Sequence, residues 1–392
     1  GHLDGLSDRK SPAWLSGPMR GQRQGLVAAL LERFGGAVPL EYEVFGDAVL
    51  RRANARSFGY AQLPTLDLGP SRYVLGFGAD FLGTWNSPVA QNVAYGEMRQ
   101  GRPGLRGKFV QIESRMSPTG ANTDEWVAIQ PGTEGILALG LAHVILKERL
   151  RPAEGAGRAG SQIEGWSGGL TAYAPEVVEK RCGVAARRIE RLAREFAQQR
   201  PGMALIGGVP LAYTNGLFNA LAVNALHALV GTIGEPGGLI FTPQPAGGSP
   251  AGPSIDKVAA GILSSTRSPI QILMVHDANP VFGAPPAWRV REALLKIPTM
   301  VSFGSFLDET SILADLILPD HSFLESLADH VPESGSRTAV ISLAPPAMRP
   351  LYATRAMPDV LLEIGRRLRQ PLSPALPWQT YDGMLQASFA AM

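Results

Sequence analysis

Short apolar runs alternate with longer helical patterns through the first half of the chain. Residues 72–80 (RYVLGFGAD) and 107–114 (GKFVQIES) have the pattern of buried strands, and a helical pattern follows each of them, at residues 90–99 and 134–150. The second helical stretch, EGILALGLAHVILKERL, is apolar on nearly every face, which predicts a helix packed on both sides. This order of strand and helix is typical of a parallel α/β sheet.

The second half of the chain repeats this order. Residues 202–210 predict a strand that runs into a glycine turn, and the predicted helix 215–229 follows. The remaining predicted elements are the strand 269–280, the helix 287–295 and two short strands at 298–306 and 314–319. We therefore predict an α/β fold with two Rossmann-like parallel-sheet domains that face a shared cleft.

The seam between the two domains is expected in the polar, glycine-rich segment 150–169. The other candidate for the seam is the basic amphipathic helix 175–199. The simplest interpretation of its arginine-rich face is a solvated surface, and that face holds Arg187, Arg188, Arg191 and Arg194.

Composition narrows the class of protein. Of the 392 residues, 45% are apolar and 18% are charged, which excludes wholesale disorder. The 45 glycines and 32 prolines indicate many tight turns and long ordered loops. A net charge of +2 excludes a protein that coats a polyanion, so we expect no nucleic acid partner.

The single cysteine, Cys182, excludes several kinds of site. It cannot form an intramolecular disulfide, a multi-cysteine zinc site or an iron–sulfur cluster held by four cysteines. The best apolar runs, 135–146 and 217–234, are interrupted by polar residues and fall short of roughly 18 clean residues, so no membrane span is expected. The N-terminus lacks a signal-peptide profile and an initiator methionine, and we expect a mature product or a fragment.

Ligands of doubly wound sheets bind beyond the carboxyl ends of the strands, and four such ends here carry polar residues. The first is Gly76-Phe-Gly78-Ala-Asp80, with Thr84, Asn86 and Ser87 in the loop beyond it. Small residues let backbone amides approach a phosphate, although a plain tight turn explains the same glycines.

The second and third strand ends carry candidates for nucleotide contacts. In Glu113-Ser114-Arg115, the acid can bind ribose hydroxyls and the arginine can contact a phosphate or a base; a surface ion pair is the alternative. The third end holds Gln130, Thr133 and Glu134. A helix cap explains Thr133, which leaves Gln130 and Glu134 as weak candidates for contacts to a base edge.

The fourth strand end is His276-Asp-Ala-Asn279-Pro280, and the polar groups of Glu309-Thr310 and Asp315 follow later strands. A lone histidine such as His276 is more often structural than a ligand, and the six histidines form no metal-binding spacing. The chain has neither a GxSxG elbow nor a GxxxxGK[ST] loop, so hydrolase and P-loop functions have no support.

Together these strand ends form a longer pattern that resembles the molybdopterin oxidoreductase family of the dimethyl-sulfoxide-reductase type. The similar segments follow the family's order over roughly residues 25 to 365. They are Gly78-Ala-Asp80-Phe-Leu, residues 109–126 (FVQIESRMSPTGANTDEW), residues 129–134 (IQPGTE), Asn279-Pro280, Glu309-Thr310, residues 314–319 (ADLILP) and Glu325.

The resemblance implies two facing α/β domains that clamp a bis(molybdopterin guanine dinucleotide) cofactor with molybdenum or tungsten. Glu113 and Glu134 stand where the family usually has aspartate, and Gln130 stands where arginine is common. One crevice would use Gly78, Asn86, Glu113, Arg115, Gln130 and Glu134, and the other would use Gly207, Gly208, Asn279, Glu309 and Asp315.

The same resemblance suggests a division of the chain. An N-terminal piece, residues 1–35, is expected to pack on the second α/β domain. The first domain is predicted at 36–198, the second at 199–345, and a C-terminal helical segment at 346–392.

Two departures from the family bear on the chemistry. The sequence lacks the family's cysteine cluster for an iron–sulfur centre, so we expect no such cluster in this chain, and residues 40–47, where a metal ligand is expected, contain no cysteine. Some members use aspartate or serine instead, so Asp47 and Ser57 stay open as ligands. Residues 79–82, 324–329 and 350–355 are most similar to the large subunits of alternative complex III and menaquinone reductase, some of which lack the molybdenum cofactor.

Three hypotheses follow. The first is a subunit or fragment of a quinone-linked respiratory complex, without its own metal centre and peripheral to the membrane, where the resemblance favours the periplasmic face. Its partners would be an iron–sulfur subunit and a membrane quinone-reactive subunit. The second is an active bis-pterin molybdenum or tungsten oxidoreductase whose cluster lies elsewhere. The third is a plain dinucleotide-binding module, against which the lack of a complete GxGxxG speaks.

Overall fold

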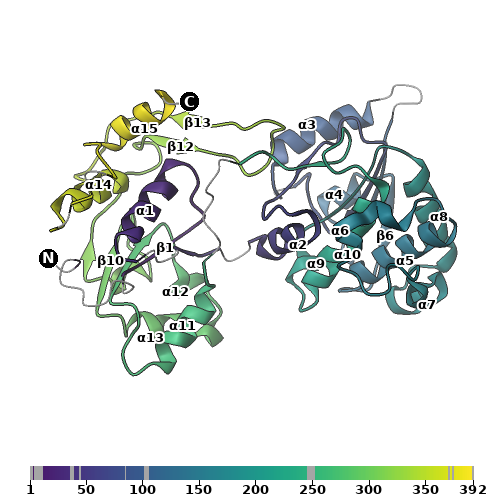
Figure 1. Cartoon of the computed structure of the whole chain (residues 1–392), viewed down its shortest axis with the longest axis horizontal. Helices are drawn as coiled ribbons and strands as arrows, with labels where there is room; N and C mark the ends of the chain where they lie inside the picture. The colour runs from purple at the N-terminus through teal and green to yellow at the C-terminus, as the bar shows by residue number, and fades with distance from the viewer. Residues whose placement is uncertain are drawn as a thin grey trace. The chain divides into compact units, whose positions relative to one another are not determined.

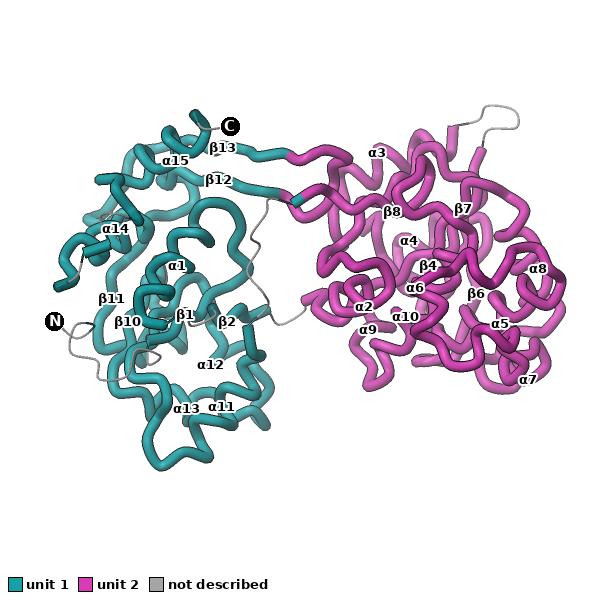
Figure 2. Tube along the Cα trace, in the orientation of Figure 1, with its two compact units in different colours: residues 1–45, 244–331, 340–392 teal, residues 46–243, 332–339 magenta. Residues whose placement is uncertain are grey.

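In the computed structural model the chain forms two compact units (Figures 1 and 2). Unit 1 consists of Gly1–Phe45, Gln244–Val331 and Val340–Met392, and unit 2 consists of Gly46–Pro243 and Pro332–Ala339. The structure describes residue 3 and residues 12–35, 39–43, 46–83, 85–100, 106–244, 252–369, 371–372 and 375–390.

Unit 2 is built around a four-stranded parallel sheet in the order β6-β5-β4-β7. The strands β4 (Tyr73–Phe77) and β7 (Gly202–Ile206) are buried along their whole length. On its other side β4 pairs with β5 (Lys108–Glu113), and β5 pairs with the edge strand β6 (Glu125–Ala128). Because strands buried on both faces are nearly continuous apolar runs, the sequence pattern predicted β4 and β5 well.

Helices cover both faces of this sheet (Figure 1). Tyr73, Leu75 and Phe77 of β4 pack in one cluster with α5 (Glu134–Lys147) and α10 (Gly216–Val230). The opposite face of the sheet packs against α3 (Pro88–Arg99). The other elements of unit 2 are α2 (Ala48–Phe58), β3 (Thr65–Leu66), α4 (Pro118–Ala121), η2 (Ala153–Ala156), α6 (Gly157–Gly160), η3 (Thr171–Tyr173), α7 (Pro175–Cys182), α8 (Ala186–Gln198), α9 (Val209–Ala212) and β8 (Leu239–Ile240).

The observed division differs from the predicted one because β7 pairs with β4. Unit 2 therefore continues past residue 199 to residue 243, and the segments 150–169 and 175–199, proposed as the seam, both lie inside it. The arginine face of α8 is part of an ion-pair network. Its partners include Glu125 for Arg188 and Arg191, and Glu148 for Arg194.

Unit 1 contains a five-stranded parallel sheet in the order β11-β10-β9-β1-β2. Its strands are β1 (Pro12–Ser16), β2 (Leu40–Glu41), β9 (Ile272–His276), β10 (Thr299–Ser302) and β11 (Leu316–Ile317). The N-terminal residues thus supply β1, which pairs with β9 inside the sheet and which the sequence pattern missed.

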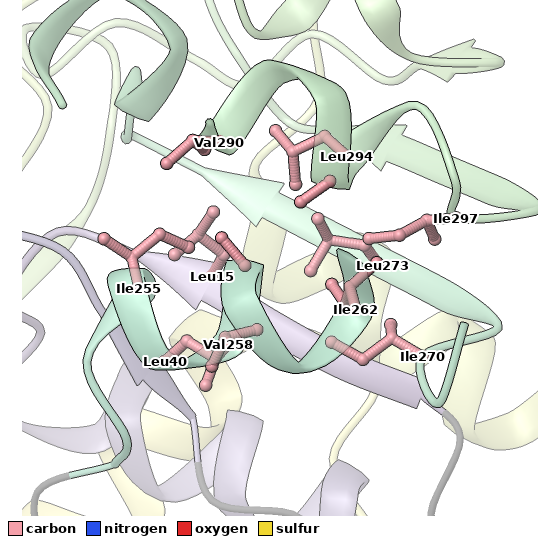
Figure 3. A pocket seen from close by; sticks show the side chains of 12 residues that line it. Leu15, Leu40, Ile255, Val258, Ile262, Ile270, Leu273, Val290, Leu294 and Ile297 are labelled. Atoms are coloured by element: carbon pink, nitrogen blue, oxygen red, sulfur yellow. The ribbon is translucent and has the colours of Figure 1, made fainter. Parts of the chain in front are cut away.

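Helices also cover both faces of the unit 1 sheet. One face packs against α1 (Gln22–Glu32), α14 (Met357–Arg367) and α15 (Tyr381–Ala390), and the other against α11 (Ile255–Ser264) and α13 (Val290–Leu294). Figure 3 shows the aliphatic side chains beneath α11, which leave only about 10 Å³ of open space and form packed core. The remaining elements are α12 (Pro280–Gly283), η4 (Pro286–Trp288), η5 (Ser311–Leu313), β12 (Ala328–His330) and β13 (Ser342–Ala344).

Among the described residues, no helix is both long enough and apolar enough to cross a membrane.

Candidate functional site

Glycines line the carboxyl edge of the unit 2 sheet. Gly78 follows β4 with φ +67°, and Gly207 and Gly208 follow the adjacent strand β7, Gly208 with φ +64°. A Cβ atom on Gly78 would come within 3.0 Å of the Pro210 ring, so the close approach of the two loops requires glycine there. Gly76, in contrast, lies within β4 and makes room for the side chain of Gln111.

Gly207 and Gly208 were predicted to belong to the second crevice, and the structure corrects this placement. Both lie in unit 2, because β7 pairs with β4 and brings them beside Gly78. A Cβ atom on Gly208 would stand 3.0 Å from the carbonyl oxygen of Gly78. Three of the predicted glycines therefore form one feature, which we call the glycine rim.

The loop after β4 passes over this rim. A Cβ atom on Gly207 would stand 2.9 Å from the indole ring of Trp85, so that ring lies against the Gly207 backbone. Next to it, Asn86 adopts a left-handed conformation with φ 62°. Its Nδ2 donates to the carbonyl of Pro64 at 2.8 Å, and its Oδ1 accepts from the hydroxyl of Ser334. Thr84 lies outside the described residues.

Glu113, at the end of β5, is oriented into the protein. Its side chain is 6% exposed, and its carboxylate accepts hydrogen bonds from the Ser117 amide at 2.6 Å, the Trp126 indole at 3.2 Å and the Gln111 amide group at 3.1 Å. These bonds hold the loop between β5 and α4. A ribose hydroxyl would have to compete with three internal donors, so Glu113 organises the loop in this structure.

Arg115 and Gln130 are the predicted residues that remain exposed at this edge. Among the described residues, neither side chain has a hydrogen bond or ion pair. The Gln130 backbone is held by the carbonyl of Cys182, at 3.0 Å. Both side chains are free to contact an anionic or amide-bearing ligand.

Glu134 is buried at the start of α5, with 1% of its surface exposed. Burial raises the pKa of its carboxyl group, and the backbone N–H groups of Gly132 and Glu134 partly oppose that shift. Asn219 bridges the start of α5 and the start of α9, because it binds the Gly135 amide at 3.1 Å and the Pro210 carbonyl at 3.1 Å. The Nδ2 of Asn219 also donates to the Glu134 carboxylate at 3.4 Å, so Glu134 is part of the support beneath the rim.

The two proposed metal ligands, Asp47 and Ser57, do not lie together at one site. Asp47 precedes α2 and accepts a hydrogen bond from the Trp85 indole at 3.1 Å. Ser57 lies at the other end of that helix, about 15 Å away along its axis, and its hydroxyl accepts from Asn224 at 3.3 Å in the core. Burial also raises the pKa of the Cys182 thiol, which disfavours the thiolate that a metal requires.

The carboxyl edge of the unit 1 sheet carries a second polar cluster. Asn279, after β9, donates to Glu309 at 2.7 Å and accepts from the hydroxyl of Thr310 at 2.8 Å. The amide of Asn279 is the largest cause of a lowered pKa of the Glu309 carboxyl, which therefore stays ionised. Asn279 and Glu309 are brought together as predicted.

Asp315 does not belong to this cluster. It precedes β11 and pairs with the start of β10, where its carboxylate accepts from the Met300 amide at 2.7 Å. Parallel strands start at one edge of a sheet and end at the other, so Asp315 lies at the amino edge. The structure therefore does not bring Asp315 together with Asn279 and Glu309.

A buried histidine–aspartate pair lies near this edge and was missed as a pair. The Nε2 of His276 is 2.9 Å from Asp320, whose other oxygen accepts from the Met357 amide at the start of α14 at 2.7 Å. The ring is 9% exposed. The pair links the end of β9 to α14, which supports the structural interpretation of His276. The sequence spacing does not predict this pair, because 44 residues separate His276 from Asp320.

The two edges differ in what they offer a ligand. At the glycine rim, exposed Gly208 lets a ligand approach the backbone, and the cationic Arg115 and the amide-bearing Gln130 are exposed at the same edge, which suits a phosphate or nucleotide. The cluster at Asn279 presents an amide and an ionised carboxylate, which suits hydroxyl or amino donors. No three histidine, cysteine, aspartate or glutamate side chains in the described parts of the chain are grouped so that they could hold a metal ion.

Comparison with known families gives one match over most of the chain. A family model described as "Molybdopterin oxidoreductase" matches residues 26–363.

Several curated proteins are also similar to this chain. The molybdopterin-binding-like subunit of menaquinone reductase from Nitratidesulfovibrio vulgaris is 29% identical over 99% of this chain and 56% of its own length. An arsenate respiratory reductase molybdopterin-containing subunit from Shewanella sp. is 25% identical over 76% of this chain and 41% of its own length. Dimethyl sulfoxide reductase of Haemophilus influenzae is 23% identical over 72% of this chain and 42% of its own length. The chain thus spans about half the length of these relatives.

Among solved structures, acetylene hydratase from Pelobacter acetylenicus is similar, with a TM-score of 0.75. The sequence identity is 16%, and the match covers 98% of this chain and 59% of that protein. At this identity the likeness concerns the fold alone.

Proposed function

The chain belongs to the molybdopterin oxidoreductase family, and we propose that it is a subunit of a quinone-linked respiratory complex. In that complex it would bind the cofactor or serve as a scaffold, and this chain would supply no metal ligand of its own. The observation that carries the proposal is the contrast within unit 2. Exposed Gly208 and Arg115 suit a nucleotide, whereas the Asp47 carboxylate beside the rim already accepts from the Trp85 indole, and Ser57 and Cys182 are buried.

The fit of the family's cofactor differs between its two ends. Gly208, the exposed glycine of the rim, would let a guanine nucleotide phosphate approach the backbone, and Arg115 would neutralise its charge. The N–H groups of Gly78 and Gly207 donate to the carbonyls of Ile112 and Phe77 and shape the rim instead. At the metal end, both candidate ligands already have hydrogen-bond partners: the Asp47 carboxylate accepts from the Trp85 indole, and the Ser57 hydroxyl accepts from Asn224. When bound, the cofactor supplies two-electron redox chemistry, and the protein supplies binding and orientation.

The residues of unit 2 would then act by position. The backbone of Gly208 would lie nearest a bound phosphate, and Trp85 covers the Gly207 side of the rim. Glu113 and Asp80 hold the loops on either side: Asp80 accepts from the Thr119 amide at 3.1 Å and from its hydroxyl. These internal bonds keep the rim pre-organised, which lowers the entropy cost of binding.

The proposed partners follow from the relatives. The menaquinone reductase relative is named as a subunit, and the arsenate reductase relative as a molybdopterin-containing subunit. We therefore extend to this chain an iron–sulfur subunit and a membrane quinone-reactive subunit as partners, and a peripheral place on the membrane, with the periplasmic side favoured.

Titration calorimetry with GDP as the probe tests the nucleotide part of this proposal. We expect saturable binding of GDP by the chain and much weaker binding of CDP, since the family's cofactor carries guanine. Arg115→Gln should weaken GDP binding, and Arg158→Gln, which changes an exposed arginine elsewhere in unit 2, should not. Equal, unsaturable heats for both nucleotides would contradict the proposal.

A second candidate, an active bis-pterin molybdenum or tungsten enzyme, is favoured by the intact glycine rim and by the reductase relatives. Its test uses the assembled complex. If Asp47 held the metal, Asp47→Ala would release molybdenum and abolish turnover, and Ser57→Ala would do so if Ser57 held it. The scaffold proposal predicts that neither substitution changes the metal content.

A further inference from the structure

Residues 332–339 come late in the sequence but belong to unit 2 (Figure 2). They form the tip of a hairpin whose strands, β12 and β13, pair antiparallel and belong to unit 1. We call residues 332–339 the hairpin tip. None of them was predicted to contribute to a site.

The hairpin tip is attached to unit 2 by charged and polar contacts along its length. Glu333, which is 9% exposed, binds Arg51 through two hydrogen bonds of 2.8 and 2.9 Å and also accepts from the Leu63 amide at 2.8 Å. The Gly335 amide donates to Thr65 at 2.8 Å, and Arg337 pairs with Asp67. A bidentate, largely buried ion pair with a third donor is a strong attachment.

One contact of the hairpin tip reaches the loop over the glycine rim. The hydroxyl of Ser334 donates to Oδ1 of Asn86, while Nδ2 of Asn86 holds the Pro64 carbonyl. Gly335 lies against Ser87, since a Cβ atom there would stand 3.1 Å from the Ser87 hydroxyl. Asn86 has φ 62°, a left-handed conformation that asparagine tolerates better than most residues with a side chain, and these two hydrogen bonds of its amide hold it there.

The base of the hairpin is attached separately within unit 1. Asp329, in β12, accepts from the Gln22 amide at 2.7 Å and from the hydroxyl of Tyr381. Burial and the nearby Asp329 carboxylate raise the pKa of Tyr381, so its hydroxyl remains a donor. The hairpin therefore joins Asp329, which is bonded within unit 1, along the chain to Ser334, which contacts Asn86 in the loop over the rim.

We propose that Ser334 and Glu333 are positioning residues for the nucleotide rim of unit 2. Glu333 anchors the hairpin tip, and Ser334 holds Asn86 in the left-handed conformation that places Trp85 against Gly207. The loop over the rim is then ordered by a segment some 250 residues away, carried on the hairpin of unit 1. The identity of the ligand rests on the proposed function; the ordering of the loop does not.

Hydrogen exchange of the full chain without ligand tests the ordering. Ser334→Ala should raise amide exchange in residues 80–92 several-fold, and Ser334→Thr, which keeps the hydroxyl, should restore it. The control is Ser336→Ala, because the Ser336 hydroxyl bonds to Thr338 within the hairpin tip and to no other described residue. Glu333→Gln should raise exchange both in the hairpin tip and in residues 80–92.

GDP titration of the same variants tests the consequence. Ser334→Ala should weaken GDP binding about two- to tenfold, the range of one net hydrogen bond, with Ser336→Ala unchanged. Unchanged exchange of residues 80–92 in Ser334→Ala would overturn the positioning role. If the wild-type chain binds no GDP while Ser334→Ala still loosens the loop, the nucleotide proposal fails and the positioning role stands.

Discussion

Replacing Gly78 by alanine is the sharpest perturbation of the glycine rim. At φ +67° an alanine pays about 1–2 kcal/mol for the left-handed conformation. Its Cβ would also come within 3.0 Å of Pro210. Pro210 lies in the first turn of α9, and its ring cannot rotate away, so overpacking adds about 1–3 kcal/mol. The expected loss of unfolding free energy for Gly78→Ala is therefore about 2–5 kcal/mol.

Gly165 provides the matched control, because it has φ +77° and a Cβ atom there would meet nothing within 4 Å. Gly165→Ala should cost only the conformational part, about 1–2 kcal/mol. Urea unfolding of the wild-type chain and both variants measures the difference, provided that the dependence on urea is the same in all three. GDP affinity should fall in Gly78→Ala and stay unchanged in Gly165→Ala. Equal losses of stability would refute the argument that loop contact requires glycine at residue 78.

Three further predictions address other parts of the structure. Burial lowers the pKa of His227 to about 3. The unfolded imidazole takes up a proton below its ordinary pKa of about 6.5, so the free energy of unfolding should fall by about 1.4 kcal/mol per pH unit between pH 6 and pH 4. Urea unfolding should show a shallower pH dependence for His227→Gln. Thr119→Val removes a fully buried hydroxyl that binds Asp80 and accepts from the Leu82 amide at 3.0 Å, which should cost about 1–3 kcal/mol in the same assay; a change near zero would contradict the role of Asp80 as an anchor. Asp315→Asn should leave GDP affinity unchanged while lowering stability, because Asp315 lies at the amino edge of its sheet; a marked loss of affinity in calorimetry would contradict that placement.

Local pattern was sufficient for the buried elements of unit 2. The strands β4 and β5 and the helix α5 are long apolar runs bounded by turn residues, and such runs report burial directly. Likewise, glycine and asparagine after a strand pointed to residues 78, 86 and 279, since parallel strands gather their carboxyl ends at one edge.

The pattern could not give the order of the strands in space. β7 follows β6 in the sequence but pairs with β4, and β1 pairs with β9 across more than 250 residues. Those pairings are decided by packing between distant segments, and no local period encodes them. Gly207 and Gly208 were assigned to the wrong unit for this reason.

Side-chain partners were also beyond the sequence pattern. Asp315 and Glu309 are six residues apart, yet they lie at opposite edges of the sheet. Asp315 directly precedes β11 and therefore lies at the amino edge, whereas Glu309 lies beside Asn279 at the carboxyl edge. Ser334 has no distinguishing spacing, and only its contact with Asn86 shows its role. Glu113 has the right position for ribose, but its orientation toward Ser117 and Trp126 emerges from the folded loop.

The most direct test of the account measures guanine nucleotide and molybdenum in the same sample of the purified native complex. Nucleotide released by acid is quantified by chromatography, and molybdenum and tungsten by mass spectrometry, after growth with each metal supplied. We predict guanine nucleotide in the sample and a molybdenum or tungsten content that Asp47→Ala and Ser57→Ala leave unchanged, because this chain supplies no ligand to the metal. One metal atom per chain, lost on either substitution, would contradict it.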